Sequence, residues 1–338
     1  MKKHTLFVSI GAALLLSACG GGGGSSGNTG TGPGPIQGST LSPITSANAT
    51  RVAANAYEAA STISESSAAF GGVLTGVSID RPTISAVTPA LNLAKRAYAR
   101  SAGQVVTGVT ISEPCSGGGS LTIEANLRNQ QTISNGDTMV IVANRCVEAG
   151  DIISGTMRAT FTDISGDILN SWTWSATLDT RFDNFSVSSG SESANVNGDM
   201  KIAMSQTSST SSAVTVSGRS LQATEQRSGT TIATRTLSDF SMTGNMRGTT
   251  ITSAANFTMS GNTSALGQFS YSVRNVQPFV SSGTSLPNTG ALIVNGASTS
   301  VTLTVAGANS VRLDLSDKAS GAVTQTSTVS WTELLQAI

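Results

Sequence analysis

The sequence predicts a mainly β protein: a large antiparallel meander, as an open curved sheet, a sandwich or a barrel-like closure, with one or two N-terminal helices. Ser, Thr, Gly and Asn are abundant in the 338 residues and only 11% are charged, as in exported β proteins with many turns. Apolar and polar residues alternate at 121–127, 172–178 and 301–305, the pattern of strands with one buried face. Asn-Gly pairs favour two-residue hairpin turns, because both residues accept positive φ; they occur at 135–136, 197–198 and 295–296.

The first residues have the pattern of an export signal. Two lysines precede an apolar run at 6–16 that is too short to span a bilayer. The run ends in Leu16-Ser17-Ala18-Cys19, which resembles the lipobox of bacterial lipoproteins. The resemblance implies that residues 1–18 are a removed signal peptide and that Cys19 becomes the N-terminus. It also implies a diacylglycerol on the Cys19 sulfur and an amide-linked acyl chain such as palmitate, which together anchor a protein stably.

Residues 19–43 read as the lipidated cysteine and a Gly/Ser/Pro-rich tether without apolar periodicity. In lipoproteins of the well-studied sorting type, an aspartate after the cysteine favours retention in the inner membrane. Gly20 occupies that position here. The resemblance therefore implies a lipid anchor in the cell outer membrane, on its periplasmic or its surface face.

Residues 44–102 are expected to be a helical segment, and residues 103–338 an antiparallel β domain. Apolar positions at helical spacing predict one helix within 46–70, and Pro89 with the residues after it predicts another at 89–100. Both helices are expected to cover an end or an edge of the sheet. A faint repeat occurs at 154–158, 197–201 and 243–247. It indicates either a true duplication or the turn-then-strand pattern that any meander reuses. Each copy is expected to begin a strand after a turn.

Cysteine and histidine usage limits the chemistry. Beside Cys19, the chain contains only Cys115 and Cys146, which we expect to form a disulfide in an oxidising periplasm. A two-cysteine metal site is the alternative, but it lacks further ligands. The single histidine, His4, lies in the leader, so the mature chain is expected to have no imidazole catalysis and no His-ligated metal.

Four aromatic side chains form the candidate ligand-binding site. Trp172 and Trp174 are expected to share one strand face, joined by Phe182 and Phe185, in a chain with only 4% aromatic residues. Such a stripe could stack on sugar rings or contact acyl chains. The alternative is that the four residues belong to the core.

Acidic residues and net charge bear on the partners. Asp179 and Asp183 flank Arg181, and they read as an exposed ionic turn at a strand end rather than as the carboxylate pair of a glycan hydrolase. Removing Lys2 and Lys3 from the 19 basic residues leaves 17 against 19 acidic residues. This balance argues against binding to nucleic acid.

The sequence contains no catalytic motif on a suitable element, so we expect no enzyme activity, cofactor or metal. The first hypothesis is a membrane-anchored envelope lipoprotein that acts as a non-enzymatic binding or scaffold module, with a lipid, a glycan or an envelope protein as its ligand. The second is a periplasmic carrier of lipid or another apolar ligand in a concave β-sheet. The third is a carboxylate-based glycan hydrolase, which requires two acidic residues buried in one cleft.

Overall fold

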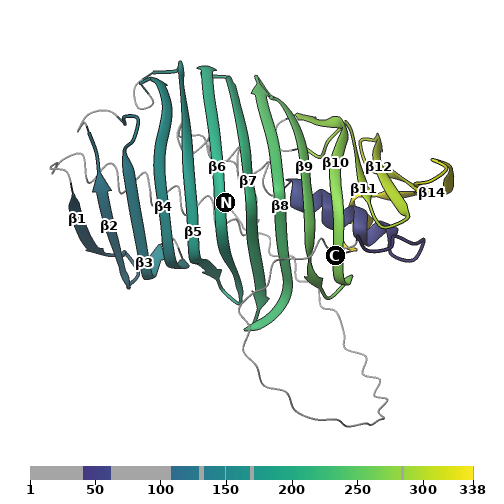
Figure 1. Ribbon diagram of the computed structural model, residues 1–338, viewed down its shortest axis with the longest axis horizontal. Coiled ribbons are helices and arrows are strands. Elements are labelled where there is room, and N and C mark those ends of the chain that lie inside the picture. Colours follow the sequence, from purple (N-terminus) through teal and green to yellow (C-terminus); the bar gives the residue numbers. More distant parts are fainter. Residues whose placement is uncertain are drawn as a thin grey trace, which may run out of the picture. The chain divides into compact units, whose positions relative to one another are not determined.

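The computed structural model describes residues 41–61, 108–128, 133–148, 150–167, 171–282 and 285–337. Cys19, most of the tether and the helix expected at 89–100 lie outside these residues. The described strands form one 14-stranded sheet in which every strand pairs antiparallel with its neighbours in sequence (Figure 1). The predicted meander is confirmed, and it takes the open form, with β1 and β14 as its two edges.

The strands of the meander differ in length, and those from β4 to β10 are the longest. At about 3.4 Å per residue, strands of 14 to 18 residues extend about 48 to 61 Å. The strand bounds are β1 (Val109–Pro114), β2 (Ser120–Asn126), β3 (Thr138–Glu148), β4 (Asp151–Gly166), β5 (Trp174–Ser189), β6 (Glu192–Ser208), β7 (Ser211–Arg227), β8 (Thr230–Arg247), β9 (Thr250–Thr263), β10 (Gly267–Ser282), β11 (Thr289–Asn295), β12 (Thr299–Gly307), β13 (Ser310–Asp317) and β14 (Val323–Ser330).

One face of the sheet is apolar and buried, as the alternating segments predicted. In β2, Leu121 and Ile123 are buried while the residues between and beyond them are more exposed. Val301 and Leu303 repeat the pattern in β12. Because successive side chains of a strand point to opposite faces, this alternation assigns each residue to the buried face or to the outer face.

Of the three Asn-Gly pairs, one lies in a turn, one straddles the end of a strand, and one lies inside a strand. Asn135–Gly136 precedes β3, and Gly296 follows the end of β11. Gly198 instead lies inside β6, at a β-bulge where the register with β7 shifts. The Asn197 side chain accepts a hydrogen bond from the Asn184 N–H of β5 at 2.7 Å. The prediction of a turn at 197–198 was therefore wrong, because the positive φ of Gly198, +125°, serves a bulge equally well.

The faint repeat lies inside strands and does not begin them. Its copies fall within β4, β6 and β8, which overturns the expectation that each follows a turn. The first two copies share a bulge glycine without room for a side chain. A Cβ on Gly155 would lie 2.1 Å from the Asn184 carbonyl oxygen, and one on Gly198 would lie 2.2 Å from the Ser220 carbonyl oxygen.

The N-terminal helix occupies residues 49–61 and confirms that part of the predicted helix at 46–70; residues 62–70 are not described. Asn48 closes its first turn, because its Oδ1 accepts from the Thr45 N–H at 2.8 Å. Val52, Ala53 and Ala56 are fully buried. Their spacing places one apolar face of the helix toward the core.

The segment 41–61, which we call the strap, contacts β8 to β12. Ser42 exchanges hydrogen bonds with Ser270 of β10, at 2.8 and 3.0 Å. Thr299 of β12 donates to the Ile44 carbonyl oxygen at 2.6 Å. Tyr57 packs edge-on against Phe279 of β10, with the ring centroids 5.3 Å apart.

The C-terminal helix α3 (Trp331–Leu335) completes this part of the core. A capping box joins Ser330 and Glu333 at its start. Trp331 is buried and lies 4.8 Å from the Tyr57 ring. Neither α3 nor the helix at 49–61 has the length and apolar character to cross a membrane, and the same holds for every helix in the described residues.

Candidate functional site

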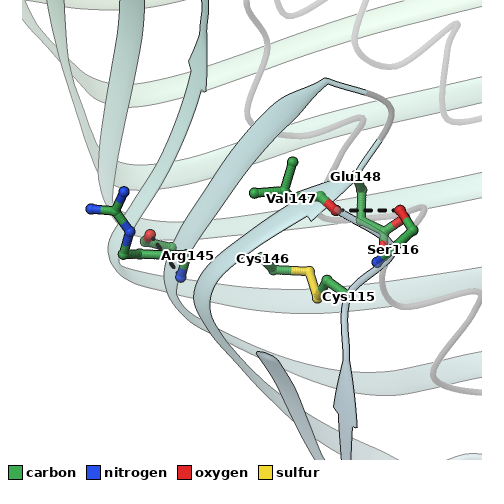
Figure 2. The surroundings of a disulfide bond; sticks show 7 residues. Cys115, Ser116, Arg145, Cys146, Val147 and Glu148 are labelled. Carbon is green, nitrogen blue, oxygen red and sulfur yellow. Dashed lines mark hydrogen bonds between the residues drawn. A yellow bond between two sulfur atoms is a disulfide. The ribbon is translucent and has the colours of Figure 1, made fainter. Parts of the chain in front are cut away.

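The predicted disulfide between Cys115 and Cys146 is present in the structure (Figure 2). The bond links Cys115, which directly follows β1, with Cys146 in β3. The two Cα atoms are 5.3 Å apart. Both cysteines are buried. The turn that follows Cys115 is also bonded to β3 through its backbone, because the Gly117 N–H donates to the Val147 carbonyl at 3.0 Å.

Glu148 is the one further side chain near the two sulfur atoms that could act as a metal ligand in the described residues. Figure 2 shows Ser116 next to Glu148. The Glu148 carboxylate accepts from the Ser116 N–H at 3.1 Å and from its hydroxyl at 3.0 Å. Because the sulfur atoms are bonded to each other, this group acts as a structural staple of the first three strands.

Three of the four candidate aromatic residues lie in the buried face of β5. Trp174, Phe182 and Phe185 are 6%, 3% and 0% exposed. A bulge at 183–184 returns Phe185 to the face of Phe182, and the two rings lie 5.6 Å apart. The Trp174 Nε1–H donates to Gln206 Oε1 at 3.0 Å, so its polar atom is satisfied within the core.

Trp172 differs from the expectation that it shares a face with Trp174. It precedes β5 and is 55% exposed. A local turn keeps this residue out of the ladder, because the Thr173 N–H donates to Ser171 Oγ at 3.0 Å. The structure therefore separates one exposed tryptophan from three core aromatic residues.

Asp179 and Asp183 lie on the outer face of β5, not in a turn at its end. Both are exposed. Asp179 lies 3.9 Å from the ammonium group of Lys201, and Asp183 accepts from the Asn184 amide at 3.1 Å. The expected exposure is confirmed, and neither carboxylate enters a buried cleft.

A partly buried charged cluster, which the sequence did not indicate, lies where the strap meets the sheet. Arg235 of β8, with a side chain 13% exposed, is its centre. Its Nη2 donates to Glu58 Oε2 at 2.9 Å and its Nε donates to Asn55 Oδ1 at 3.1 Å. Its Nη1 donates to Glu225 of β7. We call these four residues the Arg235 cluster.

Local sequence explains how the Arg235 cluster is built. Asn55 and Glu58 are three residues apart on the helix, so both reach the same face. On the sheet, Arg235 pairs with Ala223 on one side and Gly261 on the other. These small neighbours leave space above them for a guanidinium group and two carboxylates.

The charges of the Arg235 cluster attach the helix at 49–61 to the sheet. Burial raises the pKa of Glu58 above its ordinary value of 4.5, the Arg235 charge opposes that rise, and the Glu225 charge adds to it. Both carboxylates accept from the same guanidinium: Glu58 joins the helix to the sheet, and Glu225 fixes the guanidinium within the sheet. The buried Asn55 Nδ2 has no hydrogen-bond partner in the described part of the chain.

Sequence reasoning missed this cluster because its partners are far apart in the chain. Glu58 and Arg235 are separated by 177 residues. Only the helical spacing of Asn55 and Glu58 was visible beforehand, and that spacing also fits two ordinary surface residues.

The outer face of the central strands is polar, and one row that crosses it is uncharged. Cross-strand pairing aligns a row of hydroxyl and amide side chains from β6 to β10, namely Asn195, Thr224, Thr234, Asn262 and Gln268. Further along the outer face, the ammonium group of Lys201 lies 3.9 Å from Asp179. We call the five-residue row the polar row.

Comparison with known proteins adds no family to this description. No family model, curated protein or solved structure matches the chain.

Proposed function

We propose that this protein is a membrane-anchored envelope lipoprotein that acts as a non-enzymatic binding or scaffold module. The anchor rests on Leu16-Ser17-Ala18-Cys19 and the glycines that follow. The proposal places the described sheet outside the cytoplasm, where a disulfide between Cys115 and Cys146 is stable.

The observation that carries the binding role is the polar row. Long neighbouring strands hold its five side chains in a regular array, so a partner meets donors and acceptors at fixed spacing. Charged partners are less favoured, because none of the five side chains of the polar row carries a charge.

A hydrolytic role has less support. Among the described residues, Glu58 and Glu225 form an acidic pair, and both accept hydrogen bonds from Arg235. A glycan hydrolase needs one carboxyl group to donate a proton and a second to act as nucleophile or base. Two carboxylates committed to one guanidinium serve neither role well.

Metabolic labelling with radioactive palmitate tests the anchor. We expect the full-length chain to incorporate label and to sediment with outer membranes, and Cys19→Ser to do neither. The Cys115→Ser/Cys146→Ser variant is the matched control and should keep its label. Label retained by Cys19→Ser, or absent from the wild-type chain, would contradict the proposed anchor.

Photo-crosslinking in intact cells tests the binding role of the polar row. A photoreactive residue at Thr234 should give one discrete adduct. The same residue at Thr249, in the β8–β9 turn, should not give that adduct. If Thr224, Thr234 and Asn262 all yield no adduct, the polar row is not a binding surface.

A carrier of lipid or another apolar ligand is the second candidate, and the side chains of the buried face favour it. That face is rich in methionine and phenylalanine, which suit adaptable apolar binding; among them are Met139, Met157, Phe182, Phe185, Met200, Phe240 and Met259. Native mass spectrometry of full-length Cys19→Ser, which lacks the covalent lipid, separates the candidates. Co-purified phospholipid or fatty acid would favour the carrier, and a protein-only mass would favour the binding module.

A further inference from the structure

The disulfide lies beside a carboxylate that is able to share a metal ion with the two sulfur atoms. Cys115 Sγ, Cys146 Sγ and one carboxylate oxygen of Glu148 all lie within 4.8 Å of one another. The two cysteines are 7% and 0% exposed, whereas Glu148 is partly exposed. The group therefore combines two sulfur ligands with one oxygen ligand that an ion can reach from solvent.

Strand β3 and Ser116 hold Glu148 in this position. Glu148 and Cys146 are two residues apart in β3, so both side chains project from the same face of the sheet. The Ser116 N–H and hydroxyl each donate to one oxygen of the Glu148 carboxylate, which ties Glu148 to the residue next to Cys115. Because a carboxylate has about four lone-pair sites, it can accept from Ser116 and bind an ion at the same time.

The charges around the disulfide favour a cation. Asp151 pairs with Glu148 across the β3–β4 hairpin, so a second carboxylate lies on the same face. Arg145 is the basic residue nearest to Cys146 in the sequence, and Figure 2 shows its side chain directed away from the two sulfur atoms. A positive charge that enters this group therefore meets carboxylates and no competing guanidinium from Arg145.

We propose that Cys115, Cys146 and Glu148 bind Zn²⁺ when the disulfide is reduced, so that the metal replaces the S–S bond between the two cysteines. Reduction needs a dithiol, which transfers two electrons and two protons to the S–S bond and itself becomes a disulfide. Zn²⁺ then displaces the two thiol protons and forms two Zn–S bonds, while the carboxylate supplies a Zn–O bond. Water completes the four ligands of the ion.

Binding of the ion requires little rearrangement of the backbone. A Zn–S bond is about 2.3 Å long, so two sulfur atoms on one tetrahedral ion lie about 3.8 Å apart. The Cα atoms of Cys115 and Cys146 are 5.3 Å apart, and rotation of the two side chains supplies the larger separation of the sulfur atoms. Because thiolate ligands select zinc over magnesium, the site should discriminate between these two cations.

Co²⁺ is the probe for the sulfur ligands, because it absorbs in the near ultraviolet when thiolates bind it. Full-length Cys19→Ser, which lacks the third thiol, is reduced with a phosphine and desalted without oxygen. One equivalent of Co²⁺ should then give the band, and Zn²⁺ but not Mg²⁺ should abolish it. The oxidised chain and the Cys115→Ser/Cys146→Ser variant should give no band. A reduced chain without the band, or a band that Mg²⁺ abolishes, would overturn the proposal.

Substitution of Glu148 tests the oxygen ligand. In the same reduced background, Glu148→Gln should weaken Zn²⁺ binding by about tenfold or more, since loss of an outer-shell partner alone has an effect of that size. Glu124→Gln is the matched control, because it removes an exposed carboxylate of β2, and it should leave the affinity unchanged. Equal affinities of the two variants would overturn the assignment of Glu148.

Hydrogen exchange measured by mass spectrometry locates the bound ion without relying on any Glu148 variant. Zn²⁺ should restore protection in β2 and β3 of the reduced Cys19→Ser chain, and it should have no such effect on the chain that also lacks Cys115 and Cys146. Zn²⁺ binding without restored protection would place the ion elsewhere and overturn the proposal. Neither experiment depends on the proposed anchor, because Cys19→Ser carries no lipid.

Discussion

Arg235 is a residue of the sheet that binds two side chains of the strap at once. Its guanidinium group binds Glu58, Glu225 and Asn55 at once, while its own side chain is 13% exposed. Removing a partner from a buried ion pair costs about 3 to 5 kcal/mol. The two carboxylates here are 36% and 38% exposed, so solvent screening lowers the cost.

We expect Arg235→Ala to lower the free energy of unfolding by about 2 kcal/mol. Urea denaturation followed by circular dichroism measures the change. Arg227→Ala, which removes an exposed pair with Glu192, should change it by less than about 0.5 kcal/mol. Equal effects of the two substitutions would show that the Arg235 cluster stabilises the fold no more than an exposed ion pair does.

Glu58 makes the cluster sensitive to pH. Burial raises its pKa above 4.5, so between pH 4.5 and the raised value the folded chain holds the proton more tightly than the unfolded chain. The stabilising contribution of Glu58 is therefore full at low pH and is lost as pH rises through the raised pKa. Glu58→Gln is neutral at every pH and keeps an oxygen for Arg235.

The stability of Glu58→Gln relative to wild type should therefore increase as pH rises from about 4 to 7. Thermal unfolding across that range measures the difference. Glu333 supplies the opposite sign, because hydrogen bonds from Ser330 lower its pKa. Its contribution is present above pH 4.5 and is lost as pH falls, so Glu333→Gln should become relatively less stable as pH rises. Parallel slopes for the two variants would contradict the assigned pKa directions.

At the scale of single elements, bulges decide how the long strands pair. Gly198 has φ +125° and would place a Cβ 2.2 Å from the Ser220 carbonyl oxygen. Gly190, in the turn between β5 and β6, has φ +58° and open space around its Cα. Gly190 therefore needs only a positive φ, whereas Gly198 needs both a positive φ and the close approach of a neighbouring backbone.

We expect Gly198→Ala to cost about 3 kcal/mol or more, because strain and a backbone clash add together. Gly190→Ala should cost about 1 to 2 kcal/mol, the price of left-handed backbone alone. Chemical denaturation of both variants gives the comparison. If Gly198→Ala is as mild as Gly190→Ala, the bulge in β6 is not a fixed feature of the fold.

At the scale of the whole molecule, the disulfide and the strap stabilise different groups of strands in the sheet. Each strand pairs only with its neighbours in sequence. The Cys115–Cys146 disulfide joins the segment after β1 to β3, whereas the strap contacts β8 to β12. Away from the strap, stability in such an array is expected to be local, because the ladder hydrogen bonds extend only to the next strand.

Reducing the disulfide should therefore lower hydrogen-exchange protection in β2 and β3 and leave β8 to β10 unchanged. The chain-entropy model gives about 3 to 4 kcal/mol for a loop with a separation of 31 residues. Exchange monitored by mass spectrometry on oxidised and reduced chains makes the measurement, with Cys115→Ser/Cys146→Ser as the control for the reductant. A uniform loss of protection across the sheet would show one cooperative unit instead.

Much of the fold could be predicted from the sequence, but little of the Arg235 cluster could. The alternation at 121–127 and 301–305 predicted strands with a buried face, and Cys115 and Cys146 predicted their own pairing. Asn197–Gly198 and Trp172 were misplaced because local sequence does not distinguish a turn from a bulge, or the end of a strand from the residues before it. Both distinctions depend on which residue of the neighbouring strand lies opposite.

By itself, the sequence determined the features that rest on neighbours along the chain: alternating strands, the helix at 49–61 and the order of a meander. Tertiary structure decided the bulges, the open edges and the partner of Glu58. The physical reason is register. A shift of one residue in β7 or β8 would turn Glu225 or Arg235 to the outer face, and no local pattern records which register the whole sheet adopts.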